Sequence, residues 1–122
     1  MITLNWSGYK KLTEDGINSL PTYSGVYKLA TYNTQSELYT PFYVGQAEDI
    51  KARTQQHAGE NEENSCINTN FDKYSVYMNH TAVSKQEDRD AVEVALYNRY
   101  TPECNNKDSL PDVVPAAVSS FN

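Results

Sequence analysis

Tyrosine, arginine, histidine and glutamate side chains occur in this chain at spacings that regular secondary structure would bring together. Tyr27 and Tyr43 fall in two short candidate strands, and a hairpin of these strands can place the two phenols close together if the registers agree. Arg53 and His57 are four residues apart, so they share one face of a helix. Glu93 lies inside a later candidate helix, beside a stripe of Ala and Leu.

An anionic substrate bound together with a divalent metal ion would satisfy these side chains at the same time. Ile50 and Thr54 lie on the same stripe as Arg53, so this arginine faces the sheet and needs an anion or a carboxylate as its partner. Glu93, in its apolar surroundings, needs a cation in the same way. Carboxylate oxygens are ligands of Mg²⁺, and a bound metal ion stabilises negative charge on a reacting phosphate. The residue types therefore predict a metal-assisted site for an anionic group.

The elements that position these residues follow from hydrophobic period, capping signals and turn residues. We expect these elements along the chain: a weak helix at 9–20, strands at 24–30 and 42–45 around a polar loop at 32–41, a helix at 47–59, an exposed acidic loop at 60–70, a strand at 71–78 and a helix from Ser84 to about Tyr100. Ser84 and Glu87 match a capping box at the start of the last helix. This order predicts an α+β domain on a small, mainly antiparallel sheet.

The two tyrosine segments resemble the motifs of a known family, the GIY-YIG nucleases. G-V-Y at 25–27 is similar to the first motif and Y-V-G at 43–45 to the second. Arg53 follows Tyr43 by ten residues, as the family's catalytic arginine does, and His57 occupies the family's His or Tyr position one turn later. Either tripeptide alone would occur by chance, and their combination at these spacings carries the resemblance.

A later block at 93–105 extends the resemblance. The segment E-V-A-L-Y-N-R-Y-T-P-E-C-N is similar to the family's metal-binding glutamate, helix, proline and asparagine, which would be Glu93, Pro102 and Asn105 in this chain. The fold that the resemblance implies is a three-stranded, mainly antiparallel sheet flanked by helices.

The implied activity is that of a metal-dependent endonuclease that hydrolyses phosphodiester bonds in nucleic acid, with DNA as the expected substrate. One divalent ion, Mg²⁺ or Mn²⁺, would be held by Glu93. Arg53 would stabilise the negative charge of the pentacovalent transition state. The domain would take up residues 1–122, with the motif-bearing core at about 20–106 and a C-terminal tail at 107–122 that wraps the surface or frays.

The resemblance leaves the roles of the aromatic residues open between alternatives. Tyr27 would accept a proton from the attacking water or orient it, and Tyr43 would orient the phosphate, or the two roles would be reversed. A free phenol titrates near pH ~10, so a nearby cation must lower its pKa for this role. His57 is a second candidate for proton transfer, because the ordinary pKa of histidine suits neutral pH. Asn105 would support the site by hydrogen bonding.

Some features depart from the family pattern. The loop between the tyrosine motifs is somewhat longer than is common, and Gln46 stands where some relatives carry a lysine, which removes one candidate for activating a tyrosine. Gln46 and Lys51 are candidates for contacts with the substrate. We see no appended DNA-binding segment, and the low positive charge favours a short footprint, a single-stranded substrate or recruitment by a protein partner. Duplex, single-stranded and branched substrates all stay open.

Composition argues against a nonspecific binder of nucleic acid. The chain carries 10 Lys and Arg against 16 Asp and Glu, a net charge of −6, whereas duplex binders carry a basic stripe. Glu60, Glu62 and Glu63 are expected to form a solvated acidic loop and no metal site. A catalytically silent nucleic-acid-binding or interaction module on the same fold is therefore the alternative to a nuclease, and an acidic mimic of DNA charge is a third.

Cysteine usage and hydropathy indicate the compartment. Cys66 and Cys104 are too few for a disulfide framework and lie in no CxxC spacing, so two free thiols in a reducing cytoplasm are expected. Their spacing with His57 and His80 matches no zinc-ligand pattern. We find no signal peptide and no membrane-spanning run, which favours a cytoplasmic protein without a membrane partner. No interface signature is present, so a monomer or weak dimer is expected.

Overall fold

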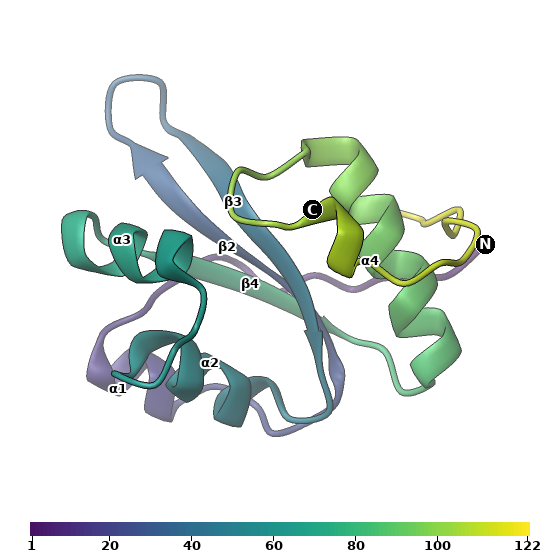
Figure 1. The fold of residues 1–122 in the computed structure, drawn as a ribbon, viewed down its shortest axis with the longest axis horizontal. Helices are drawn as coiled ribbons and strands as arrows, with labels where there is room; N and C mark the ends of the chain where they lie inside the picture. The colour runs from purple at the N-terminus through teal and green to yellow at the C-terminus, as the bar shows by residue number, and fades with distance from the viewer.

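A four-stranded antiparallel sheet in the order β1-β4-β2-β3 forms the centre of the computed structural model, which describes residues 1–122 (Figure 1). The elements run along the chain in this order: β1 (Lys10–Lys11), α1 (Glu14–Asn18), β2 (Gly25–Asn33), β3 (Leu38–Ala47), α2 (Ile50–Ala58), α3 (Ser65–Lys73), β4 (Tyr77–Ala82), α4 (Gln86–Tyr100) and a 3₁₀ helix, η1 (Lys107–Ser109). The predicted α+β class and antiparallel sheet are confirmed.

The sheet contains one strand more than the three that the resemblance implies. The sequence predicts a weak helix at 9–20, but this segment begins with β1, which pairs with β4, and only the short helix α1 follows. β1 forms because the outer edge of β4 offers unpaired backbone groups for hydrogen bonds. A two-residue strand is too short to show a hydrophobic period, so the local sequence carries no sign of it.

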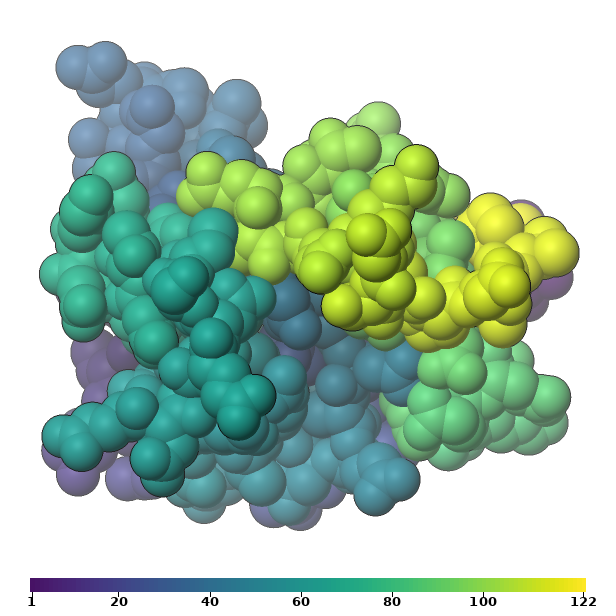
Figure 2. Space-filling model, viewed as in Figure 1, coloured from purple at the N-terminus to yellow at the C-terminus, as the bar shows by residue number.

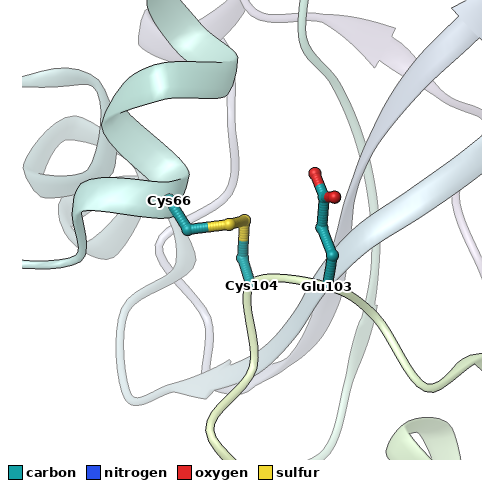
Figure 3. A group of neighbouring side chains, drawn as sticks. All are labelled: Cys66, Glu103 and Cys104. Atoms are coloured by element: carbon teal, nitrogen blue, oxygen red, sulfur yellow. A yellow bond between two sulfur atoms is a disulfide. The ribbon is translucent and has the colours of Figure 1, made fainter.

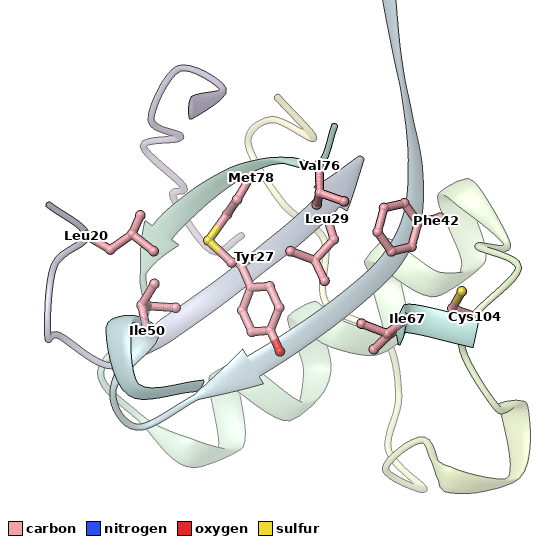
Figure 4. Close-up of a cluster of buried hydrophobic side chains, with 9 residues drawn as sticks. All are labelled: Leu20, Tyr27, Leu29, Phe42, Ile50, Ile67, Val76, Met78 and Cys104. Atoms are coloured by element: carbon pink, nitrogen blue, oxygen red, sulfur yellow. The ribbon is translucent and has the colours of Figure 1, made fainter. Parts of the chain in front are cut away.

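Helices cover both faces of the sheet, and β2 separates two apolar cores. α1, α2 and α3 lie on one face, and α4 lies on the other with the last residues of the chain (Figure 1). On β2, Tyr27 and Leu29 point into the first core and Val26 points into the second, as the strand period of two requires. The first core contains these residues (Figure 4): Leu20, Tyr27, Leu29, Phe42, Ile50, Ile67, Val76, Met78 and Cys104.

The β2–β3 hairpin is longer than the sequence predicts. β2 reaches Asn33 and β3 begins at Leu38, so the polar loop expected at 32–41 is reduced to residues 34–37. Threonine and tyrosine pairs continue the ladder to the turn, and both residue types favour strands. At the turn, the Asn33 side chain accepts two backbone hydrogen bonds.

The segment 60–70 is not the exposed loop that its composition predicts, because its second half belongs to α3. Asn64 caps this helix by accepting hydrogen bonds from the amides of Cys66 and Ile67. Ile67 is fully buried, and Glu62 is only 8% exposed. Because α3 runs on to Lys73, the strand predicted at 71–78 is displaced to β4. A short helix is easily taken for a loop when Ser, Thr, Asn and Asp make up much of its composition, as in α3.

The start of α4 differs from the predicted capping box of Ser84 and Glu87. Lys85 is the N-cap residue, and its side chain makes no capping hydrogen bond. The buried Arg89 instead donates through Nη1 to the carbonyl oxygens of Val83 at 3.0 Å and Ser84 at 2.8 Å. These hydrogen bonds fix the chain that enters the helix through its carbonyl oxygens, whereas the predicted capping box would have bonded to the first amides of the helix.

A disulfide joins Cys66 at the start of α3 to Cys104 after α4, across a sequence separation of 38 residues (Figure 3). The prediction of two free thiols is therefore wrong. Glu103 lies next to the bridge, but both sulfur atoms are used in the disulfide, so this group is not a metal site. The bridge holds the residues that follow α4, including Asn105, against α3.

The segment after η1 packs along the first residues of the chain. Ile2 and Val118 form an isolated bridge, and Phe121 packs against the second core. The Lys28 ammonium lies 4.5 Å from the centre of the Trp6 ring and donates a hydrogen bond to the Phe121 carbonyl oxygen. None of the helices combines the length and the apolar character that crossing a membrane requires.

Candidate active site

Tyr27 stands on β2 with its ring in the first core. It is 1% exposed and pairs with Gly45 of β3 on one side and His80 of β4 on the other. A Cβ atom added to Gly45 would lie 2.5 Å from the Tyr27 hydroxyl oxygen and 2.8 Å from the Tyr43 ring. The glycine of Y-V-G therefore leaves the space that both tyrosines fill, which joins the two motifs into one structural unit.

Tyr43 is the more accessible of the two phenols. It pairs with Leu29, and its ring centre lies 6.2 Å from that of Tyr27, so the structure brings both phenols together on one face of the sheet. Tyr43 is half-buried and lines a cavity of about 190 Å³ together with Glu93 and Asn105. In Figure 2 the surface is hollowed between α3 and the segment after α4, and atoms of β3 are exposed at its floor.

α2 positions Arg53 and His57 over the sheet. Asp49 caps this helix by accepting a 2.9 Å hydrogen bond from the amide of Ala52. His57 faces inward and is fully buried, whereas Arg53 is half-exposed at the rim. His57 Nε2 lies 2.6 Å from the hydroxyl oxygen of Tyr27, so the two buried side chains share a hydrogen bond. The structure thus links the histidine directly to the first tyrosine motif.

His57 carries no charge at neutral pH. Burial and the nearby positive charge of Arg53 lower the pKa of His57 to about 3. The expectation of a histidine that titrates near neutral pH is therefore wrong. His57 has an exposed fraction of 0%, and within the site its imidazole is hydrogen-bonded to Tyr27.

The charges of Arg53 and Glu93 both act on the tyrosine pair. Burial raises the pKa of Tyr27 well above its ordinary value; Arg53 lowers it and Glu93 raises it. Burial also raises the pKa of Tyr43, with the same opposing effects from the two charges. Arg53 is thus the cation beside both phenols. Burial outweighs it, so both tyrosines are protonated at neutral pH.

Glu93 reaches the site from α4 and is held by Gln46 at the end of β3. Gln46 Nε2 donates to Glu93 Oε1 at 2.9 Å and to Asp90 Oδ1 at 2.7 Å, and Gln46 Oε1 accepts from Gln86 Nε2 at 2.6 Å. Burial raises the pKa of Glu93, and Asp90 raises it further against the effect of Gln46. The amide of Gln46 is therefore engaged with α4, and its expected contact with substrate stays a prediction.

Asn105 acts on the backbone of β3. Its Nδ2 donates to the carbonyl oxygen of Val44 and its Oδ1 accepts from the amide of Val44, both at 2.9 Å. This amide pair replaces a neighbouring strand at the free edge of β3, next to Tyr43. Lys51 lies in the first turn of α2, and its side chain forms no hydrogen bond with the other site residues.

Two carboxylates lie in this region that the sequence does not predict as site residues. Asp90 shares the Gln46 amide with Glu93, and its position one turn before Glu93 is the only signal that could have identified it. Glu62 lies with Oε2 3.2 Å from His57 Nδ1, although the sequence predicts a solvated side chain. Nothing in the local pattern distinguishes Glu62 from its acidic neighbours.

The residues on α4 fit a divalent cation of the Mg²⁺ or Mn²⁺ type. Only Oε1 of Glu93 is engaged by a protein donor, so Oε2 is free to coordinate a metal ion. Carboxylate oxygens with water ligands are the usual environment of Mg²⁺. A half-buried carboxylate with a raised pKa also gains from a cation, because the cation stabilises its charged form.

Comparison of structures identifies solved domains with the same architecture. The chain is similar to the GIY-YIG N-terminal endonuclease domain of UvrC from Thermotoga maritima bound to its catalytic divalent cation, magnesium, with a TM-score of 0.59 and 17% identity over 76% of this chain and 94% of that chain. Two point mutants of that domain, also bound to the catalytic divalent cation, give TM-scores of 0.56 and 0.57 with 21% and 19% identity, over 77% of this chain and 94% of theirs.

Comparison of sequences identifies no further related protein. No protein-family model and no curated protein matches the chain. At identities of 17–21% the structural similarity is one of fold, and it covers about three quarters of this chain. The chain therefore has the fold of the GIY-YIG endonuclease domain.

Proposed function

We propose that the chain is a metal-dependent endonuclease that hydrolyses phosphodiester bonds in nucleic acid, with DNA as its substrate. The observation that carries this proposal is the meeting of Tyr27, Tyr43, Arg53 and Glu93 at the free edge of β3, from a hairpin and two helices. The similar UvrC domain, which binds a catalytic divalent cation, supports it. Residues 1–122 would act as one domain, because the segment after 107 packs against the first residues.

In this proposal each side chain has a role that follows from its position in the site. Arg53, half-exposed at the rim, binds the scissile phosphate and stabilises its negative charge in the transition state. Tyr43 lines the cavity and donates a hydrogen bond to the phosphate. Tyr27 orients the attacking water, with its own hydroxyl held by His57. Asn105 keeps β3 in register behind them.

Glu93 would hold a single Mg²⁺ or Mn²⁺ ion, with Asp90 beside it. When bound, such an ion polarises the phosphate and stabilises the leaving oxygen. Gln46 orients both carboxylates. Lys51 is proposed as a contact with the substrate backbone outside the site, since its ammonium group makes no hydrogen bond to the catalytic residues.

Cleavage assays with purified protein test the proposal. Plasmid, linear duplex and single-stranded DNA are incubated with Mg²⁺ or Mn²⁺, and Arg53→Ala and Glu93→Ala are each expected to lower the rate by about 100-fold or more. Arg99→Ala and Glu87→Ala are matched controls, because both side chains are exposed on α4. Cleavage that survives both site variants would exclude this active site.

A catalytically silent nucleic-acid-binding or interaction module on the same fold is the second candidate, because the net charge of −6 gives the chain little electrostatic attraction for the polyanion that a nuclease must capture in every turnover. A silent binder would hold DNA in chelator with a salt-dependent affinity and would cleave none of the substrates. The nuclease would instead require the metal ion for cleavage. Binding and cleavage measured in parallel with and without Mg²⁺ separate the two.

A further inference from the structure

A buried glutamate stands in the acidic segment between α2 and α3. Glu62 is 8% exposed, whereas its neighbours Glu60 and Glu63 are exposed to solvent. Its backbone carbonyl accepts a 2.8 Å hydrogen bond from Asn68 Nδ2, and its Oε1 accepts from the amide of Asn64 at 3.4 Å. The start of α3 therefore holds this side chain in one orientation, away from solvent.

The second carboxylate oxygen of Glu62 faces His57. Glu62 Oε2 lies 3.2 Å from His57 Nδ1, and both atoms are buried without a hydrogen-bonding partner. Leaving a buried carboxylate oxygen without a donor is costly, and a small rotation of the imidazole would supply one from Nδ1, 3.2 Å away. The proton of the neutral His57 ring is therefore favoured on Nδ1, next to Glu62.

This tautomer determines the direction of the next hydrogen bond. With the proton on Nδ1, the Nε2 atom of His57 carries a lone pair and can only accept. Tyr27 lies 2.6 Å from Nε2, so its hydroxyl must donate its single proton to His57. The lone pairs of the Tyr27 oxygen then point away from His57, toward the side where Tyr43 and Arg53 lie.

The opposite tautomer would reverse the polarity of Tyr27. If Nε2 carried the proton, Tyr27 would accept that bond, and its own proton would point toward the substrate. Tyr27 would then offer a donor to the attacking water, which needs an acceptor for its leaving proton. The position of one proton on His57 thus decides whether Tyr27 can orient the water.

We propose that Glu62 is a positioning residue of the active site, which holds His57 in the Nδ1-protonated tautomer so that Tyr27 presents its lone pairs to the attacking water. This role rests on the proposed nuclease function. Arg53 is the charged group that faces Glu62, His57 and both tyrosines, and its positive charge stabilises the buried carboxylate. Glu62 itself touches no substrate.

Nitrogen-15 NMR of the imidazole rings tests the tautomer without substrate or metal. The chain has two histidines, so a His80→Asn variant assigns the signals of His57. The wild-type protein is expected to show a protonated Nδ1 and an unprotonated Nε2. A wild-type His57 protonated on Nε2 would overturn the proposal at once.

Variants at position 62 test the consequence for catalysis. Glu62→Ala is expected to shift His57 toward the Nε2-protonated form and to lower kcat by on the order of 10- to 100-fold, with KM within about twofold. Glu62→Gln offers an amide oxygen to Nδ1–H, so it should retain the tautomer and recover most of kcat. Glu63→Ala removes the same charge from an exposed neighbour and should change neither quantity.

Two further outcomes are decisive. If folded Glu62→Ala protein keeps the wild-type tautomer and kcat, Glu62 has no positioning role. If Glu62→Ala does not fold, the wild-type tautomer and the Glu62→Gln variant still decide the matter. An inactive wild-type protein would overturn the proposed function and the catalytic part of this inference, while the NMR signals would still report whether Glu62 sets the hydrogen-bond direction.

Discussion

Gly45 lies directly opposite Tyr27 in the β2–β3 ladder, at a position where any side chain would collide with the tyrosine hydroxyl. The added Cβ would lie 2.5 Å from that oxygen, well inside van der Waals contact. The backbones of Tyr27 and Gly45 cannot move apart independently, because both belong to paired strands of the sheet. The hydrogen bond between Tyr27 and His57 therefore depends on the absence of a side chain on a different strand.

Gly45→Ala is expected to displace the Tyr27 ring and to break its hydrogen bond to His57. Overpacking of this kind costs about 1–3 kcal/mol of unfolding free energy. DNA cleavage should fall more than stability does, because a displacement of about 1 Å at a reacting group can cost on the order of 100-fold in rate. Urea unfolding and cleavage rates are measured side by side. Gly8→Ala is the control, since nothing lies within 4 Å of a Cβ there, and equal rates for both variants would contradict the prediction.

Metal binding is expected to depend on Glu93 and to stabilise the folded protein. In the wild-type chain, Mg²⁺ or Mn²⁺ at 100 times its Kd should add about 2.7 kcal/mol to the unfolding free energy and raise Tm. Glu93→Gln should abolish that rise and the calorimetric signal of binding. Asp90→Asn should weaken both, because it removes the neighbouring charge beside Gln46. Exposed Glu87→Gln should change neither, and a metal-induced rise in Tm that persists in Glu93→Gln would place the ion elsewhere.

Stability is expected to fall on acidification because of His57. Its pKa is about 3 in the folded protein against 6.5 as the ordinary value, so between these pH values the unfolded chain binds a proton that the folded chain does not. The contribution is complete above pH ~6.5 and is lost toward pH ~3, at no more than about 1.4 kcal/mol per pH unit. Glu93, with its raised pKa, acts in the opposite direction.

Urea unfolding between pH 7 and pH 4 measures this dependence in the wild type and in His57→Gln. The variant does not titrate at position 57, so its unfolding free energy should depend less steeply on pH. Parallel curves for the two proteins would show that another group accounts for the loss of stability in acid.

The Cys66–Cys104 disulfide is expected to stabilise the folded chain through the loop that it closes. A separation of 38 residues corresponds to about 4 kcal/mol in the chain-entropy model. Reduction, or the double Cys66→Ser and Cys104→Ser change, should lower the unfolding free energy by about 2–4 kcal/mol. Cleavage should fall as well, because the bridge holds the segment that carries Asn105. Reductant should have no effect on the double variant, which serves as the control.

The residues of the tyrosine, arginine and glutamate motifs could be predicted from the sequence because their spacings reflect local geometry. Tyr27 and Tyr43 lie on adjacent strands of one hairpin, and Arg53 and His57 share a helix face at a separation of four residues. Such relationships depend on the period of a strand or a helix, which the sequence itself carries. Glu93 could be placed in the same way, on a helix with a recognisable apolar stripe.

Only the tertiary structure shows which side chains come into contact when segments distant in the sequence pack together. Glu62 could not be told from Glu60 and Glu63, because only the packing of α3 against α2 turns one of these carboxylates inward. The Cys66–Cys104 bridge depends on the packing of α3 against the segment that follows α4. The hydrogen bonds of Gln46 to Asp90 and Glu93 likewise depend on the approach of α4 to the end of β3.

The sequence predicts the tyrosine pair, but it does not predict the neighbouring contacts that set the hydrogen bonding of these tyrosines. The spacing of G-V-Y and Y-V-G determines that two phenols and a glycine share one hairpin. The burial of His57 and the inward turn of Glu62 determine which way the Tyr27 proton points. The first is a property of local backbone geometry. The second depends on desolvation and on contacts between distant segments, which exist only once the chain has folded.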